Sequence, residues 1–141
     1  MNLGATAHVD EFDTTLLDKN LEDATVEILR GLGTRIVTGV VSRLRYRPGS
    51  SSPGQPPHVH RGKRGSSPLA QIAFAQPDPL NMIAGPLADR ETRIPRTIEE
   101  GGESIARDGS RITIAPRPFM RPTFELETMQ APSLWADCIS P

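Results

Sequence analysis

The sequence predicts an α+β fold with a long N-terminal helix, a small antiparallel sheet with a hairpin, a C-terminal helix and a long Pro/Gly-rich loop. Three observations favour this class. Apolar residues recur at helical spacing over residues 16–44. Two short alternating runs flank a proline-rich turn at 76–79. A third alternating run precedes a helix-like segment near the C-terminus. Helices and strands segregated in this way are typical of an α+β domain.

The first predicted element is a helix over residues 16–44. Asp13 is the expected N-cap, acids crowd the first turns and arginines the last, in the order that the helix dipole favours. Gly31 and Gly33 each weaken a helix by about 1 kcal/mol relative to Ala. They predict either a kink in the helix or a flat part of its surface where another backbone comes close. The apolar stripe consists of Leu17, Leu21, Ala24, Ile28, Leu29, Leu32, Ile36, Val37, Val40, Val41 and Leu44.

Residues 47–68 are dense in Pro, Gly and Ser and have no apolar periodicity, which predicts an extended, mobile loop. At 141 residues we expect an N-terminal arm at 1–15 and a single α+β domain at 16–141, with the extended loop inside it. No apolar run approaches the roughly 18 residues of a membrane span. The first residues lack the features of a signal peptide, so we expect synthesis in a cytoplasm.

The remaining elements are predicted from short apolar runs and turn residues. Strands at 69–75 and 80–87 should form the hairpin. The later segments are a short helix at 94–100, a loop at 103–109, a third strand at 110–115, and a last helix at 119–130 that Ala131-Pro132 interrupts before 133–139.

The composition favours a small folded centre with extensions. The chain has 14 prolines, 12 glycines, one Trp, one Tyr and four Phe, which suits a protein completed by its neighbours better than a self-contained enzyme. Cys138 is the only cysteine, so no intrachain disulfide can form.

Charge is unevenly distributed along the chain. Seven acids between Asp10 and Glu27 face only Lys19, whereas eight basic residues and no acid lie between Arg30 and Arg64. This polarity could align head-to-tail neighbours or present a basic face to nucleic acid. The alternative is two solvated faces of one helix and its following loop. The candidate DNA-facing residues are Arg43, Arg45, Arg61, Lys63 and Arg64.

The patterns that carry enzyme chemistry are weak. His58 and His60 could point the same way in an extended segment, but a tetrahedral metal site needs further ligands. Glu99, Glu100 and Glu103 have no nucleophile or apolar cleft in view. Phosphate-loop and dinucleotide patterns are missing. We therefore predict no catalytic residue, no cofactor and no metal, and a protein that is not an enzyme.

The segment 111–125, RITIAPRPFMRPTFE, joins a β-type run to a helix opener. Pro118 can occupy a first helical turn, where its missing N–H is not needed. Pro122 follows four residues later, so any helix that it joins must start late or bend there. Phe119 and Met120 lie between the two prolines as apolar anchors. These four residues form the packing motif of this region.

Four pieces in order resemble a tailed-phage family of head–tail joining and minor tail proteins, the neck, tail-terminator or tail-completion components of long-tailed phages. They cover roughly residues 16–135. Glu100 stands where the family commonly has an aromatic, and Arg61-Gly62-Lys63 where it has Thr-Gly-x-Leu. The pieces are the amphipathic helix ending in basic residues up to Arg47, SPGQPPHVHRG at 52–62, IAGPL at 83–87 with IEEGG at 98–102, and RPFMRPTFE at 117–125.

The resemblance implies a structural virion protein of a bacteriophage, in a homo-oligomeric ring, usually a hexamer. Its place is the neck or tail top, between the connector or stopper and the tail-tube proteins. A tail-terminator role is the first expectation. The alternatives are a stopper or tail-completion protein, or a cytoplasmic nucleic-acid-binding adaptor that uses the basic segment 43–64. Contact with genomic DNA in the lumen would be non-specific, no membrane is involved, and no catalytic residue transfers.

The resemblance also implies interface residues. Phe119 and Met120 are expected to seat the last helix against the sheet, with plain core packing as the alternative. Arg121 is expected to pair with Glu99 or Glu100. Acids near 10–27 and bases near 43–64 could meet across the heterologous contact that a ring repeats. The expected interface residues are Arg47, Pro56, Pro57, Arg61, Lys63, Arg64, Glu99, Glu100 and Arg121.

Overall fold

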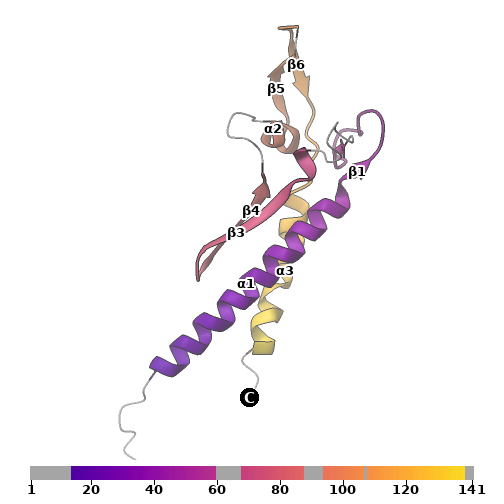
Figure 1. Ribbon diagram of the computed structural model, residues 1–141. Coiled ribbons are helices and arrows are strands. Elements are labelled where there is room, and N and C mark those ends of the chain that lie inside the picture. The colour runs from indigo at the N-terminus through magenta and orange to yellow at the C-terminus, as the bar shows by residue number, and fades with distance from the viewer. Residues whose placement is uncertain (1–13, 60–67, 88–93, 107, 139–141) are drawn as a thin grey trace, which may run out of the picture.

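The computed structural model describes residues 14–59, 68–87, 94–106 and 108–138. The predicted α+β class is confirmed (Figure 1). The elements in chain order are α1 (Thr15–Arg43), β1 (Arg45–Tyr46), β2 (His58–Val59), a 3-10 turn η1 (Pro68–Ala70), β3 (Ile72–Asp78), β4 (Asn81–Pro86), α2 (Ile94–Glu100), β5 (Gly102–Ile105), β6 (Arg111–Ile114) and α3 (Arg121–Cys138).

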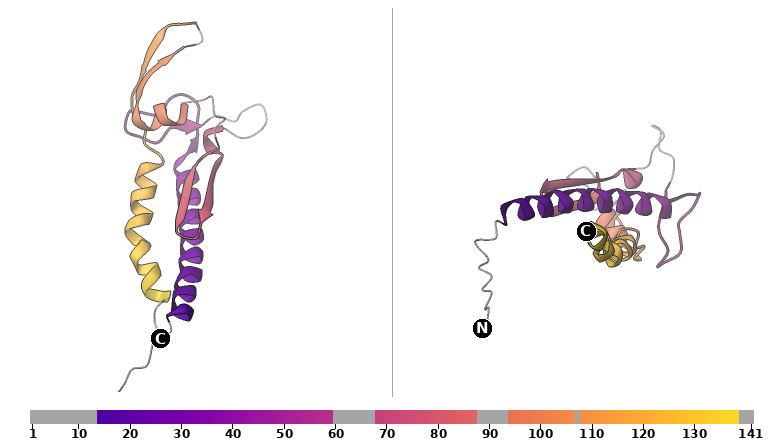
Figure 2. Two further views of the ribbon diagram at one scale, coloured as in Figure 1. Left: turned by 90° about the vertical axis from the view of Figure 1, so that its left-hand side faces the viewer. Right: turned by 90° about the horizontal axis from the view of Figure 1, so that it is seen from below.

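Helix α1 is the spine on which the other elements pack. It runs for 29 residues without a break at its glycines, which corresponds to about 40 Å. The β3–β4 hairpin lies along one side of α1 and α3 lies along another (Figure 2). The expected N-cap Asp13 lies outside the described residues. The N-cap is Thr14, whose side chain forms no capping hydrogen bond.

The strands form three separate two-stranded ladders. β3 and β4 are antiparallel, which confirms the predicted hairpin, whereas β1 and β2 pair in parallel. The expected third strand is β6, but its antiparallel partner is β5, from a segment that we predicted to be a loop. The missed signal was Asp108-Gly109. Gly109 has a φ of +83°, and the Asp108 carboxylate accepts hydrogen bonds from the N–H and hydroxyl of Ser110, which close the hairpin turn.

Helix α3 differs from its prediction at both ends. It begins at Arg121, so Pro122 is its second residue, in agreement with the requirement for a late start. The predicted interruption at Pro132 is wrong, because α3 continues through this proline to Cys138. Two side-chain contacts hold the part of α3 before this proline against α1. The Nε atom of Arg35 lies 2.9 Å from an oxygen of Glu127, and its guanidinium also bonds to the Gln130 side chain.

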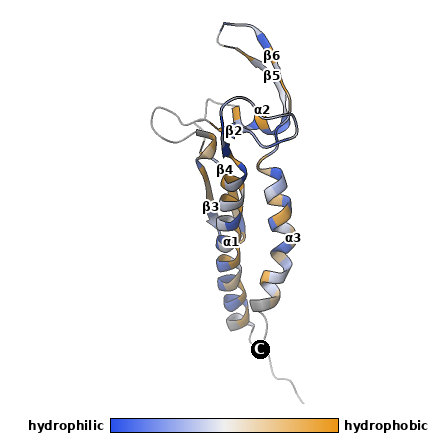
Figure 3. Cartoon of the chain, turned by 90° about the vertical axis from the view of Figure 1, so that its right-hand side faces the viewer, coloured by the Kyte–Doolittle hydropathy of each residue, from blue (hydrophilic) through white to orange (hydrophobic). Residues whose placement is uncertain are grey.

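The core is small and is centred on one stripe of α1. Figure 3 shows apolar and polar residues interspersed along both long helices. Leu17 and Leu21, which belong to the predicted stripe, are exposed. The buried apolar residues among those described are Ile28, Leu32, Ile36, Val40, Leu44, Val59, Ile72 and Phe119.

The described part of the Pro/Gly-rich segment packs against this core. In residues 47–59, Ser51, Pro57 and Val59 are buried, and β2 pairs with the strand that follows α1. The predicted extended loop is therefore not confirmed for this part. Residues 60–67, with Arg61, Lys63 and Arg64, lie outside the described residues.

Two helical glycines of α1 provide room for close neighbours, which is the second of the two predicted roles. A Cβ atom built on Gly33 would lie 2.5 Å from Cδ2 of Phe74, on strand β3. A Cβ atom on Gly39 would lie 2.7 Å from Cγ2 of Thr123, on α3. These glycines allow the hairpin and the second helix to approach α1 closely, and they do so without a kink.

Gly33→Ala should lower the free energy of unfolding by about 1–2 kcal/mol, because displacing the Phe74 ring outweighs the gain of about 1 kcal/mol in helix propensity. Gly31→Ala is the matched control on the same helix, because a Cβ atom at this position would have no heavy atom within 4 Å. It should raise the unfolding free energy by about 0.5–1 kcal/mol. Urea denaturation measures both values, and equal shifts for the two variants would contradict the close-packing argument.

Candidate functional site

Three of the four pieces that carry the family resemblance meet at one junction. Backbone and side-chain atoms of Arg117 make two of the links: its N–H donates to the carbonyl of Ile98 (2.7 Å), and its Nε donates to the carbonyl of Ser51 (3.1 Å). The N–H of Gly54 donates to the carbonyl of Pro116 (2.9 Å). The junction therefore ties the segment after α1 and the short helix α2 to the chain that leads into α3.

Glu99 of α2 caps the N-terminus of α3. One carboxylate oxygen accepts hydrogen bonds from the N–H groups of Phe119 (2.8 Å) and Met120 (3.0 Å), and the other from the N–H of Arg121 (2.8 Å). The first N–H groups of a helix have no partner within it, and a negative charge there is favourable. The next residue, Pro122, has no N–H to satisfy. Glu99 therefore serves as a cap supplied from another element.

This geometry differs from the predicted ion pair between Arg121 and Glu99 or Glu100. Glu99 binds the backbone of Arg121, and Glu100 pairs with Arg96 at 2.9 Å. Within the described residues the guanidinium of Arg121 has no ion pair. Backbone donors thus occupy three of the roughly four acceptor sites of the Glu99 carboxylate, and Arg96 pairs with Glu100. The predicted pairing of Arg121 with either glutamate is not formed within the described residues.

The packing motif contributes to the core. Phe119 is 1% exposed and belongs to the same cluster as Ile36 and Val40 of α1, with Met120 half-buried against it. This arrangement agrees with the plain core packing that was the alternative for both residues. Pro118 and Pro122 are half-buried on either side of Phe119.

A second feature, which we call the arginine pocket, lies where α1 ends. Its volume is about 570 Å³. Arg43, Arg45 and Arg47 line it. None of their guanidinium groups forms an ion pair or a hydrogen bond with a described residue. No acid is among its lining residues. These are Ser42, Arg43, Arg45, Arg47, Ser50, Ser51, Ser52, Gln55, Pro56 and His58.

The wall of the arginine pocket is tied to the junction through Ser51. The carbonyl of Ser51 accepts the hydrogen bond from Arg117, and its hydroxyl oxygen is buried without a partner in the described part of the chain. The Nδ1 atom of His58 is in the same situation. A buried polar atom without a partner costs about 1–3 kcal/mol. The pocket therefore combines unpaired cations with unmet hydrogen-bonding capacity.

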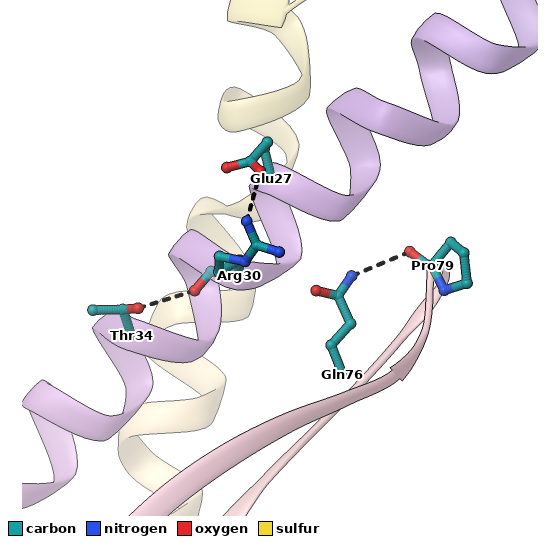
Figure 4. Close-up of polar contacts among 5 residues, drawn as sticks. All are labelled: Glu27, Arg30, Thr34, Gln76 and Pro79. Atoms are coloured by element: carbon teal, nitrogen blue, oxygen red, sulfur yellow. Dashed lines mark hydrogen bonds and ion pairs between the residues drawn. The ribbon is translucent and has the colours of Figure 1, made fainter.

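The opposite end of α1 is acidic. Asp18, Glu22 and Asp23 are exposed, and no described residue pairs with them. Further along, the Glu27 carboxylate lies 2.8 Å from Arg30, whose carbonyl accepts a hydrogen bond from Thr34 (Figure 4). The charge polarity of the sequence is thus laid out along a single helix, with unpaired acids at its start and unpaired arginines at its end.

Many large apolar side chains are exposed. Among the described residues there are 13 of them, against eight buried apolar residues. They are Leu17, Leu21, Val41, Tyr46, Leu80, Ile83, Leu87, Ile94, Ile105, Ile112, Phe124, Leu126 and Met129.

The remaining predicted site residues have different surroundings. Arg47 is exposed, Pro56 is half-buried, and Pro57 is buried within the chain itself. His58 lies in β2, whereas His60 falls outside the described residues. In the described ranges, no three His, Cys, Asp or Glu side chains are grouped as metal ligands. None of the described helices is both long enough and apolar enough to cross a membrane.

Comparison with known proteins identifies no relative: no protein-family model, curated protein or solved structure matches this chain.

Sequence reasoning missed the capping role of Glu99 and the linking role of Arg117. One signal for the cap was present. The positions before the observed start of α3, 118–120, hold no Ser, Thr, Asp or Asn, so the first N–H groups needed an acceptor from elsewhere. The sequence did not indicate which acid would supply it.

Glu99→Ala should lower the free energy of unfolding by about 2 kcal/mol, because three backbone N–H groups lose a charged acceptor. The amides of Phe119, Met120 and Arg121 should also exchange faster with solvent than in the wild type. Glu100→Ala is the matched control, since it removes a neighbouring glutamate from an exposed pair, and it should change stability by less than about 0.5 kcal/mol. Hydrogen exchange and urea denaturation check both, and equal behaviour of the two variants would argue against the cap.

Proposed function

We propose that this chain is a non-enzymatic structural subunit that assembles with copies of itself into the ring at the head–tail junction of a tailed phage. The observation that carries the proposal is the balance of apolar residues, with more large ones exposed than buried among the described residues. Contiguous apolar exposure marks interaction surfaces in soluble proteins, and a small core with many apolar side chains outside it is expected of a chain that buries some of them against neighbours. A subunit that is completed by its neighbours accounts for this balance.

The β5–β6 hairpin supports the same proposal. It projects away from the rest of the described chain (Figure 1), and Ile105 and Ile112 on it are 73% and 43% exposed. A two-stranded hairpin is marginally stable at best when it stands alone in water. Ile105 and Ile112 lie on opposite faces of this ladder, so contact with a neighbouring subunit would cover one of these faces or an unpaired strand edge.

The placement in the phage neck rests on the resemblance of residues 16–135 to head–tail joining proteins. Its support is that three of the four resembling pieces contact one another at the Glu99–Arg117 junction. Within that family the expected role is a tail terminator in a six-fold ring. Its neighbours would be the connector or stopper on one side and the tail tube on the other. A stopper or tail-completion protein differs from it in position along the neck.

A second candidate function is a nucleic-acid-binding adaptor, and the arginine pocket favours it. Arg43, Arg45 and Arg47 are unpaired within the described residues and could neutralise phosphates without reading sequence. The two candidates differ in a measurable way. An adaptor binds DNA as a single chain with a steep dependence on salt, whereas a ring subunit self-associates and its arginines are covered by protein.

The purified full-length chain should sediment as an oligomer at a concentration of tens of micromolar. Electron cryomicroscopy of virions, with the symmetry tested and not imposed, should place about six copies between the connector and the tail tube. The height of the ring separates terminator from stopper. A monomer in solution, together with absence from the particle, would overturn the structural proposal. Salt-dependent binding of that monomer to DNA would then favour the adaptor.

A further inference from the structure

The start of α1 presents an uncovered seam that the chain itself does not fill. Leu17 and Leu21, four residues apart, are 57% and 48% exposed, although they continue the stripe that Ile28 buries further along the helix. Asp18 and Glu22 follow them at the same spacing, so two carboxylates border the two leucines. We call these four residues the acidic seam.

The acidic seam and the arginine pocket cannot meet within one chain. Helix α1 is unbroken between them, and the 21 residues that separate Glu22 from Arg43 correspond to about 30 Å. Both features carry charges without partners in the described residues: Asp18, Glu22 and Asp23 at one end, and Arg43, Arg45 and Arg47 at the other.

The two features are complementary in charge and in shape. One is the outer side of a helix end with exposed leucines and acids, and the other is a concave, acid-free pocket of about 570 Å³. Two exposed apolar side chains, Val41 and Tyr46, adjoin the lining residues along the chain but do not line the pocket themselves. A helix end with carboxylates therefore supplies the negative charge that the arginine pocket lacks, and its leucines add apolar side chains beside that charge.

We propose that the acidic seam of one copy docks into the arginine pocket of the next copy. The occupant of the pocket is thus the carboxylates of a second copy of this chain. Docking pairs both sets of free charges at once and covers Leu17 and Leu21. A nucleic-acid strand would pair only the arginines and would leave the acids at the other end of α1 without partners.

This contact is heterologous, because each copy uses a different surface on each side. Repeated from copy to copy it closes into a ring or continues as a filament. The inference rests on the proposed self-assembly and names the surfaces that perform it. Because the pocket wall includes Ser51, which Arg117 holds, the junction would position the receiving surface for the neighbour.

Charge reversal in the full-length protein tests the proposal. One variant carries Asp18→Lys and Glu22→Lys, and the other carries Arg45→Glu and Arg47→Glu. Each alone should weaken self-association by at least about tenfold at 50 mM NaCl, because attraction between exposed charges becomes repulsion. Sedimentation velocity across a concentration series measures the association. The wild type should also associate more weakly at 500 mM NaCl.

Restoration gives the decisive result. An equimolar mixture of the two variants should associate again, because the reversed seam of the first faces the reversed pocket of the second, and the native seam of the second faces the native pocket of the first. A chain with all four substitutions should likewise self-associate. Glu27→Arg with Arg30→Glu, which exchanges the charges of an exposed ion pair in the middle of α1 and outside both docking surfaces, is the control and should behave as the wild type.

Far-ultraviolet circular dichroism establishes that every variant folds. If a reversed variant does not, Asp18→Asn with Glu22→Gln and Arg45→Gln with Arg47→Gln replace the pairs, and each should still weaken association. If either charge-reversed variant self-associates as strongly as the wild type, the docking contact is overturned, whereas the proposed ring still stands. A wild type that is monomeric throughout would overturn both. A labelled DNA duplex bound through Arg45 and Arg47, with assembly unaffected by their reversal, would assign the pocket to nucleic acid and overturn the proposal.

Discussion

The hydrogen bonds from Phe119, Met120 and Arg121 to the Glu99 carboxylate are the constraint on which the rest of this structure depends. They join a seven-residue helix, α2, to the start of α3, and so determine where α3 begins. A helix that opens with a proline at its second position has few donors to satisfy, and one carboxylate is enough. Phe119 is then placed in the core, and α3 is directed along α1.

Few residues build the apolar core of this fold. The stripe of α1, together with its C-cap residue Leu44, supplies five of the eight buried apolar side chains among the described residues, and the other elements add single residues to it. Glycines at 33 and 39 let the hairpin and α3 approach this stripe closely. A core of this size leaves the outer surfaces of α3 and of both hairpins apolar and uncovered, which is the property that the proposed assembly uses.

Assembly through charged helix ends has a physical advantage over assembly through apolar surfaces alone. Exposed ion pairs contribute little to affinity, about 0–1 kcal/mol each, but they select orientation and exclude like-charged contacts. Apolar side chains such as Leu17 and Leu21 would supply most of the free energy of association, while the acids and arginines would specify head-to-tail order. A ring needs that order, because its subunits must all face the same way.

The sequence by itself determined the α+β class, the long first helix, the β3–β4 hairpin, the short helix α2 and the late start of the last helix. These follow from local periodicity, proline stereochemistry and turn residues. It also indicated the charge polarity of α1, although Arg61, Lys63 and Arg64 lie outside the described residues. Its error at Pro132 came from reading an internal proline as the end of a helix, whereas α3 continues through it to Cys138.

Only the tertiary structure decided which groups meet. The cap at Glu99 and the link between Ser51 and Arg117 each join segments that are distant along the chain. Glu99 and Phe119 are 20 residues apart, and Ser51 and Arg117 are 66 apart. Spacing in the sequence carries no information on such pairs. Two adjacent glutamates, 99 and 100, look alike in the sequence, and only the fold directs one to a helix terminus and the other to a surface arginine.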